Sequence, residues 1–127
     1  MRTSTALGLV LLVAVGIAAT PTAAADLASA WQIRATFRDG ARAVPLCIFQ
    51  QTGDALSGTC KGPNSFGTAT GTVRGARVRF TWHAKAYTSI GMSGDIEFSG
   101  IQGPPNIVAG TAIDSQGASG NFVATRQ

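Results

Sequence analysis

Short runs of β-forming residues recur about every 8 to 13 residues from Trp31 onward, separated by Gly, Pro, Asn and Asp. The clearest run alternates: Val78, Phe80 and Trp82 lie on one face, and polar or charged residues lie on the other. No stretch of this region has the periodicity of an amphipathic helix. The pattern predicts eight strands, over residues 31–37, 44–50, 56–61, 68–74, 77–84, 93–100, 107–113 and 119–125.

Links as short as residues 74–76 imply that strands adjacent in sequence pair in space. Eight strands joined in this way can close on themselves, which removes exposed sheet edges. We therefore expect an all-β fold, a small eight-stranded antiparallel up-and-down β-barrel, with a β-sandwich as the alternative. The interior of such a barrel is either filled by side chains or has room for one small ligand. The function depends on whether the interior is filled or hollow.

Two cysteines, Cys47 and Cys60, flank the turn signal at residues 52–54 between two β-rich runs. A two-residue loop at Gly53 and Asp54 pairs residue 52 with 55, and counting outward places residue 47 opposite residue 60. That is a non-hydrogen-bonded pair, in which side chains approach most closely. We predict a Cys47–Cys60 disulfide worth about 3 kcal/mol in the chain-entropy model. A redox pair is the other interpretation, but it lacks a C-x-x-C motif.

The N-terminus has the order of a secretory signal peptide. Arg2 is followed by an apolar run from Ala6 to Ala19 and by small residues ending at Ala25. This run is shorter than the roughly 18 to 20 residues of a membrane-spanning helix, so we expect cleavage before Asp26 rather than a retained anchor or stable membrane insertion. Residues 1–25 are then the signal peptide, and residues 26–127 form one domain that is secreted or periplasmic, where disulfides persist.

Few residues suggest catalysis. His83 is the single histidine and lies on the polar face of its strand, as a surface residue does. There is no His/Cys metal cluster, no G-x-S-x-G elbow and no phosphate-binding loop. Asp95 and Glu97 share one strand face and could act as a carboxylate pair, but the alternating apolar residues favour a solvated outer face. We expect no catalytic residue, no metal, no cofactor and no enzyme activity.

Arginines gather at two predicted hairpins and could bind an anionic partner if both clusters share one end of the barrel. The alternative is ordinary solubilising charge. Without Arg2 there are 9 Lys and Arg against 6 Asp and Glu, a net charge of +3, and no basic run interleaved with aromatics, so no nucleic-acid partner is expected. The clusters are Arg34, Arg38 and Arg42, and Arg74, Arg77 and Arg79.

Residues 54–60, with the sequence DALSGTC, resemble the L-[ST]-G-T-Y strand of the avidin and streptavidin family. The later order of T-G at residues 70–71, a strand ending in Trp82 and M-S-G at residues 92–94 is also similar, and Trp31 opens the first strand. The resemblance implies a small secreted barrel. Tight biotin binding is not expected, because unmatched buried polar groups cost about 1 to 3 kcal/mol each. The family's biotin contacts align with Ile33, Phe37, Cys60, Met92, Gly110 and Gly120.

Two binding functions remain open. In the first, a small apolar or aromatic ligand enters the barrel mouth and packs on Trp31, Phe80 and Trp82, with Thr88 and Ser89 orienting it. In the second, the interior is filled, and the loops and a basic outer face bind another exported protein, for instance as an inhibitor of an exported enzyme. The loops would be residues 85–91 and 102–106.

Overall fold

The computed structural model describes residues 26–127, and the predicted signal peptide lies outside the described residues. Within that range the fold is all-β, and no helix is long and apolar enough to cross a bilayer. Each of the eight expected strands is present within a few residues of its expected bounds. The strands are β1 (Ser29–Phe37), β2 (Arg42–Ala43), β3 (Leu46–Thr52), β4 (Ala55–Lys61), β5 (Ser65–Arg74), β6 (Arg77–Ala86), β7 (Gly94–Gln102), β8 (Ile107–Asp114) and β9 (Ser119–Arg126).

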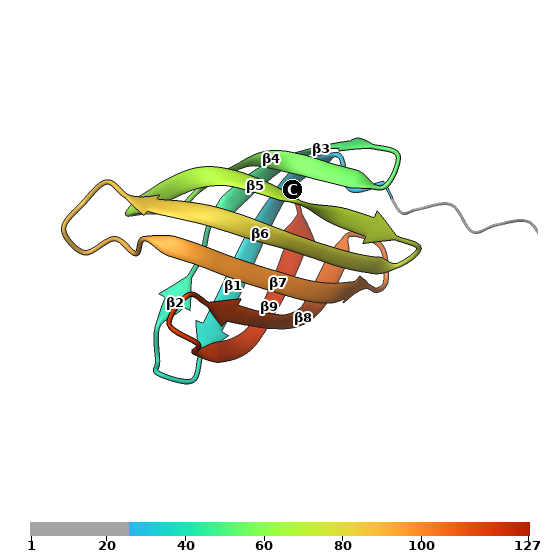
Figure 1. The fold of residues 1–127 in the computed structure, drawn as a ribbon. Coiled ribbons are helices and arrows are strands. Elements are labelled where there is room, and N and C mark those ends of the chain that lie inside the picture. Colours follow the sequence, from blue (N-terminus) through green and yellow to red (C-terminus); the bar gives the residue numbers. More distant parts are fainter. Residues whose placement is uncertain (1–25) are drawn as a thin grey trace, which may run out of the picture.

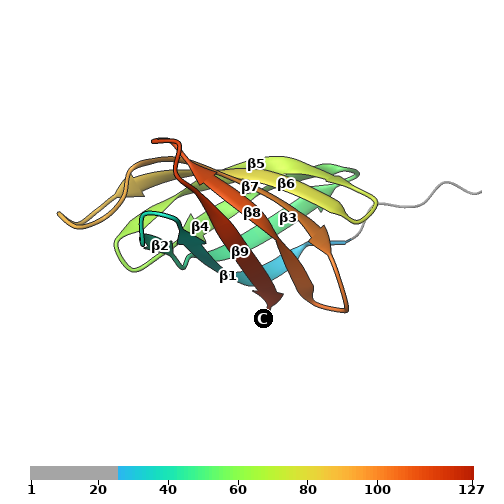
Figure 2. The ribbon, with the colours of Figure 1, turned by 90° about the horizontal axis from the view of Figure 1, so that it is seen from below.

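The sheet closes into an antiparallel up-and-down barrel (Figures 1 and 2). The barrel order is β1-β3-β4-β5-β6-β7-β8-β9, and β9 pairs back to β1, which excludes the open edges of a sandwich. The extra strand β2 pairs with the end of β1 in the register that β3 continues, Ala35 with Ala43 and Gln32 with Leu46. The two are halves of one strand, interrupted at Pro45, which has no N–H to donate to the ladder.

The β3–β4 hairpin has the predicted register. Thr52 pairs with Ala55 and Cys47 pairs with Cys60 across the two-residue turn. Gly53 has φ +64°, the positive value that a type II′ hairpin turn requires at its first central position. Cys47 and Cys60 form the predicted disulfide, with their Cα atoms 4.0 Å apart.

The barrel interior is filled by inward side chains from all eight barrel strands. Four phenylalanines form its centre: Phe80 stacks on Phe98 at 4.7 Å between ring centroids, and the edge of Phe49 meets Phe80 at 5.1 Å. Phe122 packs edge-on against Phe98 at 5.0 Å. The space beside Phe80 is therefore occupied by other aromatic rings, and close packing of this kind leaves few voids.

The two tryptophans lie toward opposite ends of the barrel. The hairpin end carries the turns at residues 53–54 and 75–76, the 103–106 loop and residues 26–28. There Trp31 donates its Nε1–H to the Leu27 carbonyl at 3.0 Å, and the Arg126 guanidinium lies 4.8 Å from the centroid of its ring. Trp82 reaches the other end, the long-loop end, which carries loops 38–41, 62–64, 87–93 and 115–118.

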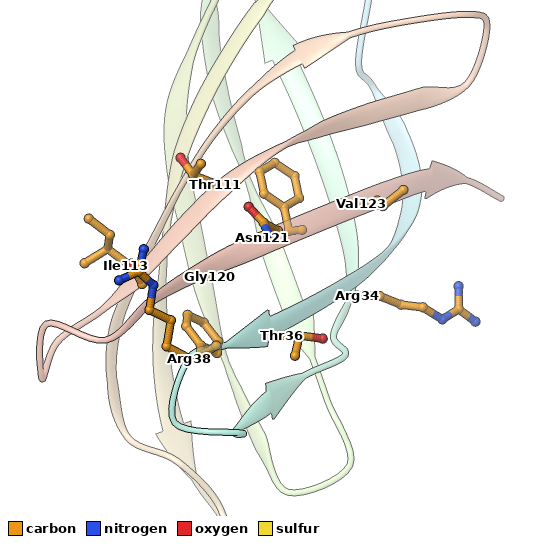
Figure 3. A pocket seen from close by; sticks show the side chains of 11 residues that line it. Arg34, Thr36, Arg38, Thr111, Ile113, Gly120, Asn121 and Val123 are labelled. Carbon is orange, nitrogen blue, oxygen red and sulfur yellow. The ribbon is translucent and has the colours of Figure 1, made fainter.

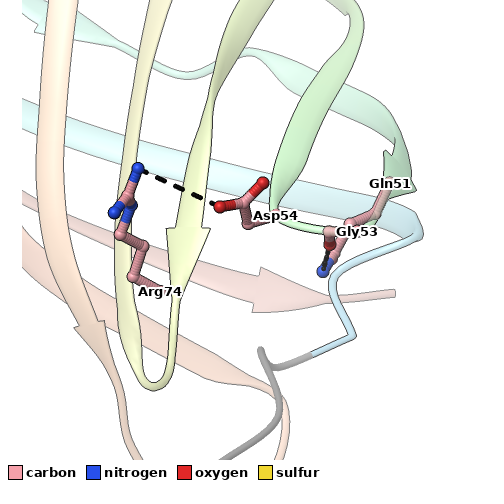
Figure 4. Close-up of polar contacts among 4 residues, drawn as sticks. All are labelled: Gln51, Gly53, Asp54 and Arg74. Atoms are coloured by element: carbon pink, nitrogen blue, oxygen red, sulfur yellow. Dashed lines mark hydrogen bonds and ion pairs between the residues drawn. The ribbon is translucent and has the colours of Figure 1, made fainter.

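The hairpin end is also held by polar contacts (Figure 4). The Gln51 side chain donates to the Gly53 carbonyl at 2.9 Å, and its Oε1 accepts the Leu27 N–H at 2.8 Å. An ion pair joins Arg74 to Asp54 at 4.0 Å, but both side chains are well exposed, so it adds little stability.

Candidate functional site

A pocket of about 140 Å³ lies in the barrel mouth at the long-loop end. Trp82 projects inward from β6, between its cross-strand neighbours Ala69 on β5 and Ile96 on β7, and lines the pocket from the core side. The remaining wall comes from β2, from Val44, from the first residue of β5 and from two loops. Its residues are Arg42, Ala43, Val44, Gly62, Pro63, Asn64, Ser65, Ile90, Gly91 and Met92.

The two loops over the pocket, residues 62–64 and 87–93, are tied together. The hydroxyl of Tyr87 donates to the Gly62 and Pro63 carbonyls at 2.9 and 2.7 Å, and Thr88 Oγ1 donates to Asn64 Oδ1 at 3.0 Å. A side chain at Gly91 would place its Cβ 2.1 Å from the Asn64 carbonyl oxygen, so the approach of the two loops requires glycine there.

A buried hydroxyl joins the second loop to the barrel. Ser65 is 4% exposed, and its Oγ donates to the Met92 carbonyl at 2.7 Å. Met92 itself packs against the core while lining the pocket. The mouth is therefore a formed structure rather than a gap between free loops.

Trp82, which lines this pocket, has one unsatisfied hydrogen-bond donor. Its side chain is 2% exposed, and its Nε1–H has no hydrogen-bond partner among the described residues. A buried donor without an acceptor costs about 1 to 3 kcal/mol, and such groups in native structures usually have an explanation. Trp31, equally buried, has its Nε1–H satisfied by Leu27. The aromatic ring that lines the mouth therefore carries a buried donor without a partner among the described residues.

The five residues predicted for the site are not brought together. Trp82 lines the mouth pocket, Phe80 lies deeper in the aromatic core, and Trp31 is at the hairpin end. Thr88 is bonded to Asn64 on the loop exterior and Ser89 is exposed; neither lines the pocket. The sequence reasoning missed the pocket residues of the two loops.

The outer face has an apolar patch around Leu46, Ile48, Phe66 and Tyr87, each 40 to 56% exposed. Leu46 and Phe66 flank Lys61 in the register of β3, β4 and β5, and the ring centroids of Phe66 and Tyr87 are 5.8 Å apart. A pocket of about 540 Å³ lies on this patch. We call this surface the apolar patch.

A groove of about 710 Å³ crosses the outer face of β8, β9 and β1 (Figure 3). Arg34 and Arg38 of β1 and its following loop line it. The other arginine cluster is elsewhere, because Arg74 and Arg77 border the hairpin-end turn whereas Arg38 is in a long-loop-end loop. The two clusters therefore do not share one end of the barrel.

Titratable residues that could suggest catalysis lie on the outer surface. His83 Nδ1 contacts Asp95 Oδ1 at 2.9 Å between paired strands, and both side chains are about half exposed. Glu97 is exposed on the same face of β7 as Asp95. Across residues 26–127 no group of three or more His, Cys, Asp or Glu is placed to hold a metal ion.

No protein-family model matches this sequence, and no curated protein matches it. Among solved structures, a redesigned β-barrel, mFAP1, bound to DFHBI, is similar with a TM-score of 0.66. The two chains are 18% identical, and the match covers 79% of this chain and 94% of that chain. At this identity the likeness shows the fold: a small β-barrel of the kind that the avidin resemblance implied. It does not show membership of the avidin family.

Proposed function

We propose that this protein is an exported, non-catalytic binding protein that holds one small aromatic or apolar ligand in the barrel mouth. The observation that carries the proposal is that Trp82, which lines the mouth pocket, has a buried Nε1–H without a hydrogen-bond partner among the described residues. A ligand with one hydrogen-bond acceptor would satisfy this donor while its ring packs on the apolar wall. The predicted signal peptide and the disulfide support action outside the cytoplasm.

The pocket size sets the ligand size. A volume of about 140 Å³ is below the roughly 300 to 1,000 Å³ of drug-sized sites and close to the roughly 150 Å³ cavity that accepts benzene. The ligand is therefore a single ring, and its affinity is in the micromolar to millimolar range. The structure of mFAP1 bound to DFHBI supports ligand binding by a barrel of this architecture.

Two single-ring probes test the proposal. Toluene offers no acceptor, whereas acetophenone offers a carbonyl that can accept from Trp82 Nε1. In the Trp31→Phe variant Trp82 is the sole tryptophan, so a change in emission on titration reports the mouth. We expect saturable binding, with acetophenone bound about 2- to 13-fold more tightly than toluene, as one hydrogen bond allows.

The Trp82→Phe variant is the matched comparison, because it keeps an aromatic ring and removes the donor. Calorimetry should show that its preference for acetophenone over toluene falls to about one. If neither probe binds the Trp31→Phe variant at about 4 mM, or if Trp82→Phe retains the preference, the mouth is not the ligand site.

A second candidate function is a protein-interaction module, such as an inhibitor of an exported enzyme, and the apolar patch favours it. Exposed apolar surface of this kind marks interaction sites, and the lysine between Leu46 and Phe66 suits a partner with acidic groups at its rim. Purified protein on a column should retain such a partner from the secretome of its source. Phe66→Ser should abolish retention, and Ile101→Ser, exposed to a similar degree elsewhere, should not.

A further inference from the structure

The groove over β8, β9 and β1 is strongly cationic at its two ends. Figure 3 shows the Arg34 and Arg38 side chains pointing away from each other, with Thr36 and Asn121 between them. Residues four apart on an extended strand have Cα atoms about 13 Å apart. The groove is therefore an elongated site with a guanidinium at either end and small polar side chains along its floor.

These guanidinium groups have no internal counter-charge. Arg34, Arg38 and the flanking Arg42 form no ion pair with any residue of the 26–127 region. Two acids lie next to the groove residues in sequence, Asp39 after Arg38 and Asp114 after Ile113. Both accept backbone hydrogen bonds: Asp39 Oδ1 accepts the Ala41 N–H, and Asp114 Oδ1 accepts two N–H groups of its own turn. No carboxylate lines the groove. With two arginines and no acid in its lining, the groove favours an anionic occupant.

The margins of the groove indicate which anion fits. Ile113 and Val123 line it and are 50% and 47% exposed, so an occupant with apolar side chains gains by burying them. Thr111 and Asn121 offer hydroxyl and amide groups that can bond a peptide backbone. Guanidinium groups bind carboxylates through two parallel hydrogen bonds. These features together match an extended acidic peptide better than a bare polyanion.

We infer that this groove binds an extended acidic segment of another exported protein, with its carboxylates on Arg34 and Arg38. The site is separate from the barrel mouth, because none of its lining residues lines the mouth pocket. It therefore adds a partner surface that operates whether or not the mouth holds a ligand.

The test uses a fluorescent peptide of about ten residues with alternating Glu and Thr, which places all carboxylates on one side of an extended chain. Fluorescence anisotropy should show binding to residues 26–127 that weakens several-fold as salt rises from about 50 to 500 mM. The Arg34→Gln/Arg38→Gln variant should bind about tenfold more weakly, as the loss of two exposed charge pairs predicts. The same peptide with Gln in place of Glu should not bind.

Arg77→Gln/Arg79→Gln is the control, because it removes the same charge from β6, three strands from β9 and four from β1. It should bind the peptide within about twofold of the unmodified protein, and so should Trp82→Phe. The inference is overturned if both double variants weaken binding equally, because net charge alone then explains it. It is also overturned if a heparin oligosaccharide binds more tightly than the peptide and loses affinity in the Arg34/Arg38 variant.

Discussion

Replacing Phe80 with alanine tests whether the barrel interior is filled. A filled interior is the reason for placing the proposed sites at the mouth and on the outer face rather than inside the barrel. Phe80 is 4% exposed and lies at the centre of the aromatic cluster. Its ring stacks on Phe98, meets Phe49 edge-on and lies 6.4 Å from Phe122 between centroids. The substitution removes all three ring contacts and leaves a void in a close-packed interior.

The expected cost is large. Removing a buried phenylalanine costs about 3 to 5 kcal/mol, and each aromatic pair adds about 0.5 to 1.5 kcal/mol beyond buried area. With three ring partners, we expect the free energy of unfolding to fall by about 4 to 5 kcal/mol. A domain of this size has about 5 to 15 kcal/mol in total, so the variant would be close to unfolding.

Urea denaturation of residues 26–127, followed by circular dichroism, measures this loss. Phe80→Leu, which keeps much of the volume, should lose about 1 to 2 kcal/mol and remains measurable if the alanine variant does not fold. Phe66→Ala is the matched control: it removes the same ring from the outer face, where Phe66 is 47% exposed, and should cost under about 1 kcal/mol. If Phe80→Ala costs no more than Phe66→Ala, the interior is loosely packed and a ligand could enter the barrel itself.

Three further outcomes follow from the geometry. Replacing both Cys47 and Cys60 with alanine should lower the free energy of unfolding by about 3 kcal/mol, and an unchanged urea midpoint would contradict the entropic account of the disulfide. Gly91→Ala, whose Cβ would lie 2.1 Å from a carbonyl oxygen of the facing loop, should weaken acetophenone binding several-fold, whereas Gly103→Ala, with nothing within 4 Å, should not; equal effects would show that loop position is irrelevant. Tyr87→Phe removes a hydroxyl that bonds two carbonyls and should cost about 0.5 to 1.5 kcal/mol, with faster amide exchange over residues 87–93 as the readout and unchanged exchange as the contrary result.

The strands and the first hairpin were predictable because local sequence determines them. Alternation at Val78, Phe80 and Trp82 gave the inward face of β6, and the Gly53 turn gave a register in which two cysteines meet. The short strand β2 was missed, because two residues before a proline carry too little alternation to be recognised. β2 is a strand because it pairs with β1 in the same register as β3. This pairing is a tertiary contact that local sequence does not encode.

The mouth was predictable only in part. Alternation shows that Trp31 and Trp82 both face inward, but it does not give their level along the barrel axis, and the structure places them at opposite ends. The wall of the pocket depends on contacts between loops 62–64 and 87–93, which are more than 20 residues apart in sequence. No periodic signal encodes such contacts. Gly91 was a possible clue, because glycine permits a close backbone approach.

Closure of the sheet limits the ways in which this protein can bind a partner. Every barrel strand is paired on both sides, so an extended partner cannot add to the sheet by main-chain hydrogen bonds along a barrel edge. The filled core leaves side chains at the mouth and on the outer face as the binding groups. Outward residues have no packing role in the core, so substitutions there alter the outer surface at little cost in stability, whereas changes at the buried Trp82 also affect packing.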